Sequence, residues 1–254
     1  MTKIYLTFLF LLGIQFYIKA QVNTEKYRKI KDEFGFSGTA SIAATINTGN
    51  NDKQEVGIEG HFDYNTEKNL FLLILKGEYG SVNGQDYSDQ ALAHFRYLYK
   101  LSENINFEFF SQLDFDNDRL LLNRKLVGIG VRPIVFKTEV SQMWFGISYM
   151  YEIEKFDLPV SSVHPEIDYE NRLSSYITYR LNIEKNLRLS SVVYFQPEIG
   201  NWNNVKILSE NSLHVDVIKN VGIRIDFKLR YDNKPPDSIK ELDTRTNVGI
   251  TFSF

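Results

Sequence analysis

The sequence predicts an all-β protein, a single antiparallel up-and-down transmembrane β-barrel of about twelve strands. Three observations carry this prediction: side chains alternate from Gly35 to the chain end, aromatic residues are abundant, and the amino terminus is typical of an exported protein. Alternation with a period of two indicates strands with one apolar and one polar face. Strands of about ten residues with two such faces are the repeat unit of membrane-spanning barrels.

Composition agrees with a single strand-rich domain. The 254 residues include 15 Tyr and 19 Phe, and aromatic side chains favour pleated surfaces. No internal stretch resembles a linker, so residues 35–254 are predicted to form one barrel. A net charge of -3 shows no basic excess, so nucleic acid is not an expected partner. The chain has no cysteine, which excludes disulfides and thiolate metal ligands.

The first twenty residues predict a cleaved signal peptide. Lys3 supplies a positive charge, residues 4–18 are mostly apolar, and cleavage is expected after Ala20. A permanent membrane anchor is the alternative, but the apolar run is shorter than the ~20 residues that a spanning helix needs. Residues 21–34 are charged and lack alternation, so we expect a short periplasmic segment.

Turn residues divide the rest of the chain into about twelve strands, an even number as in single-chain bacterial barrels. If the chain starts on the inner side, one rim has mostly short turns and the other includes every long connection, as outer-membrane barrels do. The expected inner turns lie near Asn65, Ser102, Lys137, Asn182 and Lys219, and the outer connections near Asn50, Gly84, Asn117, Pro159, Asn203 and Pro235.

Two prolines strain this interpretation. Pro133 and Pro197 fall within predicted strands, and proline has no N–H to donate to a β-ladder. Both lie near a predicted strand end, where pairing is expected to stop or bulge.

Alternation alone does not separate a membrane barrel from an exported soluble barrel with its apolar face inside. The export signal, the rim asymmetry and the terminal Phe254 favour the membrane. A last strand that ends in an aromatic residue is similar to the signal by which outer-membrane barrels are recognised for assembly. We therefore expect an outer-membrane location, with membrane lipid and the barrel-assembly machinery as partners.

Short motifs, in a characteristic order, support a resemblance to a known family. They are Asn47-Thr48-Gly49-Asn50, Asp114 with Arg124 and Gly128-Ile129-Gly130, and Arg230-Tyr231-Asp232 with Pro235-Pro236 before Asp243-Thr244. From about Gly35 to Phe254, the chain resembles the domain of unknown function 481 family, some of whose members are named salt-induced outer membrane proteins. The first strand departs from that family's pattern, because Phe34 and Phe36 stand where a tryptophan is expected. The resemblance implies a fold and a location, and it supplies no catalytic residues.

Two polar patterns could suggest catalysis or metal binding. Ser212, His214 and Asp216 share one strand face, but same-face neighbours are about 6.5 Å apart, too far for a nucleophile, its base and an orienting acid. The Glu-His-Asp pattern at positions 59, 61 and 63 does not converge on one ion in an extended strand. The glycines at 128 and 130 are not followed by a helix, as a phosphate loop would require. No catalytic residue, metal or cofactor is predicted.

The polar face of the strands predicts a charged inner wall. Mixed signs favour cross-strand ion pairs, because buried charges are tolerated only when they are paired or hydrated. A narrow channel for ions or small polar solutes is the first hypothesis, and a non-conducting structural or osmotic-stress protein, closed by those ion pairs and by residues 21–33, is the second. An outer-membrane hydrolase ranks third. The predicted lumen-lining charges are Glu59, Asp63, Arg96, Glu108, Asp114, Arg124, Arg132, Glu152, Arg172, Arg180, Arg188, Arg224, Asp226 and Arg230.

Overall fold

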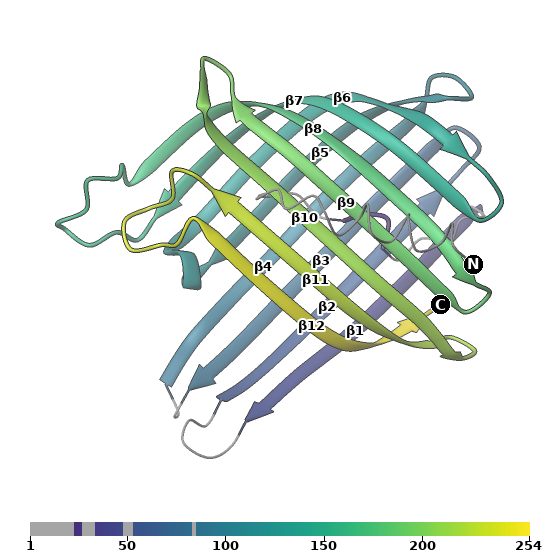
Figure 1. Ribbon diagram of the computed structural model, residues 1–254, viewed down its shortest axis with the longest axis horizontal. Helices are drawn as coiled ribbons and strands as arrows, with labels where there is room; N and C mark the ends of the chain where they lie inside the picture. Colours follow the sequence, from purple (N-terminus) through teal and green to yellow (C-terminus); the bar gives the residue numbers. More distant parts are fainter. Residues whose placement is uncertain (1–22, 27–33, 48–52, 83–84) are drawn as a thin grey trace, which may run out of the picture.

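The structure is a closed barrel in which each strand pairs antiparallel with its neighbours in sequence and β1 closes against β12 (Figure 1). This computed structural model describes residues 23–26, 34–47, 53–82 and 85–254, so the predicted signal peptide lies outside the described residues. The twelve strands confirm the predicted fold class. They are β1 (Gly35–Asn47), β2 (Lys53–Asn65), β3 (Asn69–Val82), β4 (Gln85–Lys100), β5 (Ile105–Asp116), β6 (Leu121–Lys137), β7 (Ser141–Phe156), β8 (Ile167–Glu184), β9 (Leu187–Glu198), β10 (Asn201–Ile218), β11 (Val221–Asp232) and β12 (Leu242–Ser253).

The two faces of each strand are arranged as a membrane barrel requires. On β11, Ile225 and Phe227 point outward and are 43% and 41% exposed, whereas Arg224 and Asp226 point inward and are 5% and 7% exposed. A soluble barrel would have the opposite arrangement, with its apolar side chains inside. Among the described residues, no helix is long and apolar enough to cross a membrane, which says nothing about spans made of strands.

The outer rim differs from the expected one at two connections. Strands β3 and β4 are separated only by residues 83–84, and β9 and β10 only by Ile199 and Gly200, where longer loops were predicted. Gly200 has a φ of +95°, which glycine adopts without a steric penalty, so the β9–β10 turn can be tight. The β7–β8 and β11–β12 connections remain long, over residues 157–166 and 233–241.

Strand pairing is irregular near both prolines, as predicted. Pro197 lies opposite Val205, next to a register shift between β9 and β10. Pro133 pairs with Ile105, and the β6–β7 register shifts shortly afterwards, between Ile134 and Phe136. A bulge accommodates a residue that cannot donate to the ladder.

The candidate functional site: the lumen

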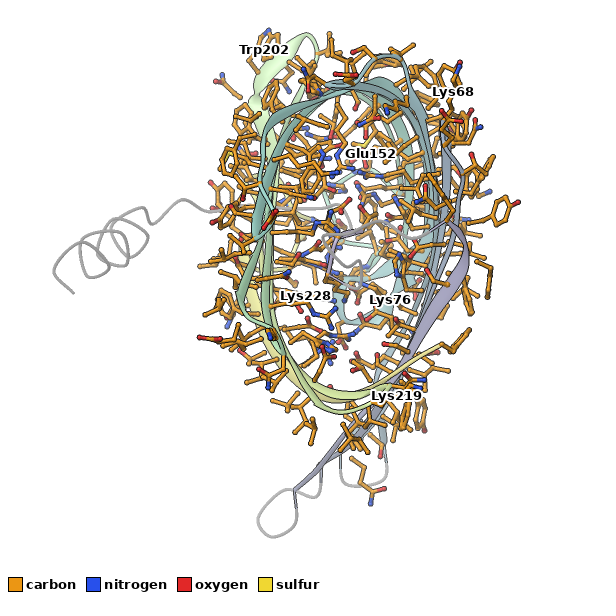
Figure 2. The ribbon with its side chains drawn as sticks, turned by 90° about the vertical axis from the view of Figure 1, so that its right-hand side faces the viewer. Lys68, Lys76, Glu152, Trp202, Lys219 and Lys228 are labelled. Atoms are coloured by element: carbon orange, nitrogen blue, oxygen red, sulfur yellow. The ribbon has the colours of Figure 1, made fainter. Side chains whose placement is uncertain are left out.

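The lumen has two sides that differ in how they are filled, and Figure 2 shows both in a view into the barrel from one end. Glu152 lies on one side, and Lys76 and Lys228 face each other across the other. We call the first the filled side, defined by Arg124, Glu152, Glu154, Glu170, Arg172 and Lys206. We call the second the hollow side, defined by Glu59, Lys76, Glu210, Arg224, Asp226 and Lys228.

The filled side is centred on a lysine held by three carboxylates. The Nζ atom of Lys206 lies 2.9 Å from Glu152 Oε1, 2.5 Å from Glu154 Oε2 and 2.7 Å from Glu170 Oε2. Oxygens of these glutamates lie within 4.8 Å of one another, close enough to hold a metal ion. The ammonium group already occupies the centre of this cluster, so the geometry is that of an ion-pair network.

Two arginines complete the network around Glu152, which is fully buried. Arg124 Nη2 lies 2.6 Å from Glu152 Oε2, and Arg172 Nε lies 2.7 Å from Glu152 Oε1. Arg172 also reaches Glu170 Oε2 at 2.5 Å. Burial of a charge is costly unless it is paired and hydrogen-bonded, and each of these groups has several partners.

An aromatic layer lies next to this network, farther from the outer rim. Tyr176 donates to Glu108 Oε2 at 2.6 Å, and the guanidinium of Arg96 lies 5.4 Å from the Phe110 ring centre and 5.5 Å from that of Tyr176. Phe110 fits because Gly128 faces it, and a Cβ at that glycine would lie 2.1 Å from the ring. Together these side chains close the filled side.

Part of the amino-terminal segment lies inside the barrel. Residues 23–26, which we call the lumen segment, are all buried, in contrast to the predicted periplasmic position of residues 21–34. Glu25 lies 2.8 Å from Arg132 Nη2 and 3.4 Å from Arg180 Nη1, while Lys26 lies 2.9 Å from Glu59 Oε1. The lumen segment therefore links β6 and β8 to β2 through ion pairs.

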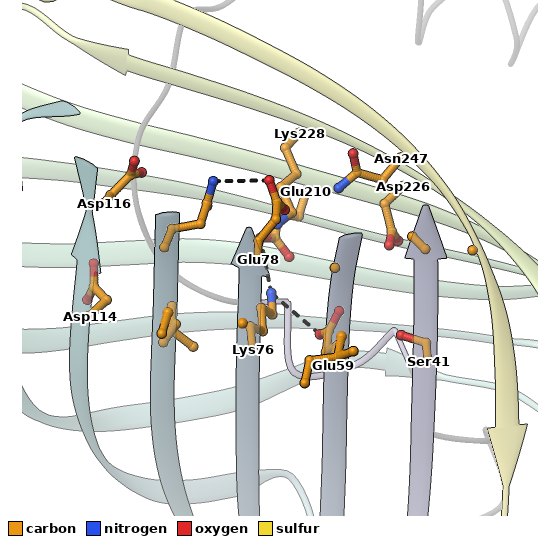
Figure 3. Close-up of a pocket in the computed structure, with 18 of the residues that line it drawn as sticks. Ser41, Glu59, Lys76, Glu78, Asp114, Asp116, Glu210, Asp226, Lys228 and Asn247 are labelled. Carbon is orange, nitrogen blue, oxygen red and sulfur yellow. Dashed lines mark hydrogen bonds and ion pairs between the residues drawn. The ribbon is translucent and has the colours of Figure 1, made fainter. Parts of the chain in front are cut away.

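A cavity of about 280 Å³ occupies the hollow side (Figure 3). Its lining includes Glu59 and Asp226, the carboxylates that approach Lys26 at 2.9 and 3.8 Å. A second cavity of about 610 Å³ lies nearer the outer loops and shares Asp116, Lys228 and Arg230 with the first. The two cavities thus form one charged space that runs from the outer rim to the lumen segment.

All of the predicted charged residues lie on the inner face, and most are brought into ion pairs. Arg96 pairs with Glu108 at 3.5 Å, Arg224 with Glu59 at 3.2 Å, and Arg230 with Asp116 at 3.1 Å. Of the remaining predicted residues, Arg188 pairs with Asp216, Asp63 lies 3.4 Å from His61 Nε2, and Asp114 accepts a hydrogen bond from Gln112.

Several residues that define the lumen were absent from the predicted set. Lys206 and Glu210 share the inward parity of β10, and Lys76 shares that of β3, so parity could have found them. Glu25 and Lys26 lie outside any strand, and no periodicity marks them.

The arrangement at positions 212–216 is not a hydrolytic triad. His214 Nε2 lies 2.8 Å from Asp216 Oδ1, but Ser212 faces Asp226 across the β10–β11 pair. At positions 59–63, His61 Nε2 lies 3.4 Å from Asp63 Oδ1, and Glu59 is engaged by Lys26. Neither pattern therefore assembles the groups that a nucleophile or a metal ion would need.

A closed barrel with an apolar exterior and a charged interior defines a transmembrane β-barrel of the outer-membrane type. A family model described as "Protein of unknown function, DUF481" matches residues 40–254. The chain belongs to this family, which confirms the resemblance found in the sequence. No curated protein matches the chain.

Solved outer-membrane barrels share the fold at low identity. A COG4313 outer membrane channel from Pseudomonas putida F1 is 10% identical with a TM-score of 0.53, covering 88% of this chain and 97% of that one. The NanC porin is 8% identical with a TM-score of 0.51, covering 85% and 98%. The translocator domain of the autotransporter NalP from Neisseria meningitidis is 10% identical with a TM-score of 0.50, covering 88% and 90%. At these identities, the similarity establishes the fold alone.

Proposed function

We propose that the chain is an exported outer-membrane protein that forms a narrow channel for ions or small polar solutes, closed in this structure by the lumen segment. The observation that carries the proposal is the charged space of the hollow side, which starts at the outer rim and ends at the ion pairs of Lys26. Charged and hydrated walls allow polar solutes to pass, and Arg124 of the filled side borders this space.

The lumen segment is suited to act as a removable obstruction. It is held by side-chain ion pairs and hydrogen bonds, such as that from the backbone N–H of Asn23 to Glu210 Oε2 at 3.0 Å. Ion pairs can be exchanged for hydration when water enters, so the segment can leave without unfolding the barrel. No catalytic activity is part of this proposal, because the outer-membrane barrels of similar fold named above are a channel, a porin and a translocator domain.

Conductance in planar bilayers tests the proposal. The mature protein is expected to show small or infrequent steps, and deletion of residues 21–33 is expected to give larger and longer ones. If neither protein conducts, the second candidate, a non-conducting structural or osmotic-stress protein, replaces the first. The buried network around Lys206 favours that candidate, since it resembles a permanent structural element.

A single substitution sharpens this test. Glu25→Gln removes the charge that pairs with Arg132 and Arg180, so the segment should leave the lumen more often. A coupling of about 1–3 kcal/mol corresponds to a rise in open probability of roughly 5- to 150-fold. Glu67→Gln, in the exposed β2–β3 turn, removes the same charge and should leave the open probability unchanged. Equal open probabilities in the two variants would exclude the lumen segment as the obstruction.

A further inference from the structure

The closure of the barrel between β1 and β12 is incomplete. The register covers Thr39↔Ser253 to Ile42↔Ile250, and Gly38 and Phe254 exchange two backbone hydrogen bonds of 2.9 Å. Beyond Ile42 and Ile250, the described strands show no further pairs across this seam, although β1 pairs with β2 up to Asn47 and β12 pairs with β11 up to Leu242. The outer ends of β1 and β12 lie apart in Figure 1. Gly249 still lies against β1, since a Cβ there would be 3.5 Å from that of Ala43, so the backbone edges that face an opening in the wall are residues 44–47 and 242–248.

The opening lies at the depth of the apolar belt. Val248 pairs with Ile225 on its other edge and Thr246 pairs with Phe227, and Val248 is 59% exposed on the outer surface. Backbone groups at membrane depth need hydrogen-bonding partners, and irregular edges are tolerated there only where they line a hydrated space or bind a partner. The unpaired edges of β1 and β12 require such an explanation.

The cavity of the hollow side supplies the hydrated space. Its lining includes Ala43 and Ala44 of β1 and residues 246–249 of β12, so it reaches both edges of the opening. Arg245 of β12 forms ion pairs with Glu55 and Glu78, which belong to β2 and β3, and ties the strands together on the outer side of the opening. Between Arg245 and Val248, the opening extends about 10 Å along β12, which is ample for one hydrocarbon chain.

The lysines of the cavity favour an anionic group. Lys76 Nζ and Lys228 Nζ approach the same oxygen, Glu210 Oε1, at 3.9 and 3.8 Å, and Lys76 lies 3.5 Å from Glu59 Oε1. These separations exceed those of charge-assisted hydrogen bonds, which are about 2.7–2.9 Å. Two ammonium groups thus face the cavity, where one carboxylate oxygen serves both. A phosphate or carboxylate that enters beside Glu210 can accept the short hydrogen bonds that neither lysine forms with it.

We propose that the β1–β12 opening is a lateral portal for a single-chain amphiphile with an anionic head. The head binds to Lys76 and Lys228 beside Glu210, and the hydrocarbon chain passes between residues 44–47 and 242–248 into the outer half of the bilayer. The ligand thus contacts both the charged cavity and the apolar outer surface next to it. This inference rests on the proposed function and names a substrate class for the same cavity. Binding of the amphiphile does not require conductance, so the two proposals can fail separately.

Photolabelling tests the portal directly. The mature protein is refolded into phosphatidylcholine vesicles with hexadecyl phosphate that carries a diazirine in its chain, and labelled residues are mapped after irradiation. Labelling is expected at residues 44–47 and 242–248, roughly tenfold above the rest of the outer surface, equivalent to about 1.4 kcal/mol of preference. Even labelling around the barrel would overturn the proposal, as would equal labelling of the portal by a trimethylammonium amphiphile of the same chain length.

Two pairs of variants separate the head site from the opening. Lys76→Gln with Lys228→Gln should reduce portal labelling about tenfold, whereas Lys68→Gln with Lys219→Gln, on exposed inner turns, removes the same charge and should not.

In the cysteine-free chain, the control pair Ile42→Cys with Ile250→Cys lies in the existing ladder and should oxidise readily. Ala44→Cys with Val248→Cys lies beyond it, so equally rapid disulfide formation would show that the seam is closed. Conductance without portal labelling would support the channel and reject the portal. Portal labelling without conductance would support the portal and reject the channel.

Discussion

The filled and hollow sides of the lumen are built from the same residue types but hold their charges differently. Lys206 lies within 2.9 Å of three carboxylates and is 3% exposed. Lys76 lies 3.5 and 3.9 Å from two carboxylates, and its side chain is 16% exposed. A charge that has a full set of partners can leave water, whereas one with fewer partners must keep some hydration. The number of close partners therefore decides which side packs and which side remains open.

The small residues of the wall reinforce this difference. On the filled side, the ring of Phe110 covers Gly128 so closely that a Cβ would lie 2.1 Å from it. On the hollow side, a Cβ at Gly57 would have its nearest neighbour, Glu78 Oε2, at 3.7 Å. Glycine makes room for an aromatic ring on one side and borders the cavity on the other.

The largest expected effect is on stability, and it compares substitutions of Lys206 and Lys76. Lys206→Met leaves three buried carboxylates without their shared cation, so the free energy of unfolding should fall by about 3–5 kcal/mol. Lys76→Met removes a partly hydrated charge and should change it by no more than about 1 kcal/mol. Urea unfolding in lipid vesicles, followed by the fluorescence of Trp144 and Trp202, measures both. Similar losses in the two variants would show that the two sides do not differ energetically.

The glycines give a second, smaller contrast. Gly128→Ala forces the Phe110 ring or the strand to move and should cost about 1–3 kcal/mol, the usual range for overpacking. Gly57→Ala places a methyl group at ordinary contact distance and should stay within about 0.5 kcal/mol of the parent protein. The same unfolding measurement applies, and a destabilised Gly57→Ala protein would mean that the hollow side is packed more tightly than the cavity indicates.

The sequence predicted the barrel because alternation is a local property of each strand. Ile225 with Phe227 and Arg224 with Asp226 already separate the two faces of β11 before any partner strand is known. Parity also identified residues that face inward, such as Glu152 and Arg172. It could not predict which of them meet, since that depends on depth and on strand register around the whole barrel.

Other features were hidden for physical reasons. Leu70 and Leu72 share the inward parity of Lys76, so part of β3 is apolar on both faces of the strand, and in the structure they pack with Leu98 inside the barrel. Residues 23–26 are polar and lack periodicity, so a solvated tail was the natural interpretation; their burial depends on Arg132, Arg180 and Glu59, which are distant in sequence. The opening between β1 and β12 likewise follows from the register at closure, which no single strand encodes.

The smallest expected effect concerns the outer loops that connect the two sides. Asp237, in the β11–β12 connection, accepts hydrogen bonds from Ser162 Oγ at 2.5 Å and from the backbone N–H groups of Val163 and His164 at 2.8 and 3.3 Å. These donors hold the pKa of the Asp237 carboxyl below its usual range, the Ser162 hydroxyl contributing most. Because the pKa is lowered in the folded state, the contact is favourable above the ordinary Asp pKa of about 4 and weakens as the pH falls through the lower folded value.

Asp237→Asn should therefore detach the β7–β8 loop from the β11–β12 loop at neutral pH without changing barrel stability. Amide hydrogen exchange at Val163 and His164 measures the effect. Exchange corrected for its intrinsic pH dependence should accelerate in the variant at pH 7, and in the parent protein only at acid pH. If the exchange of the parent protein and the variant were equal at pH 7, the two sides of the lumen would not be coupled through this loop contact, and their difference would be set by the barrel wall alone.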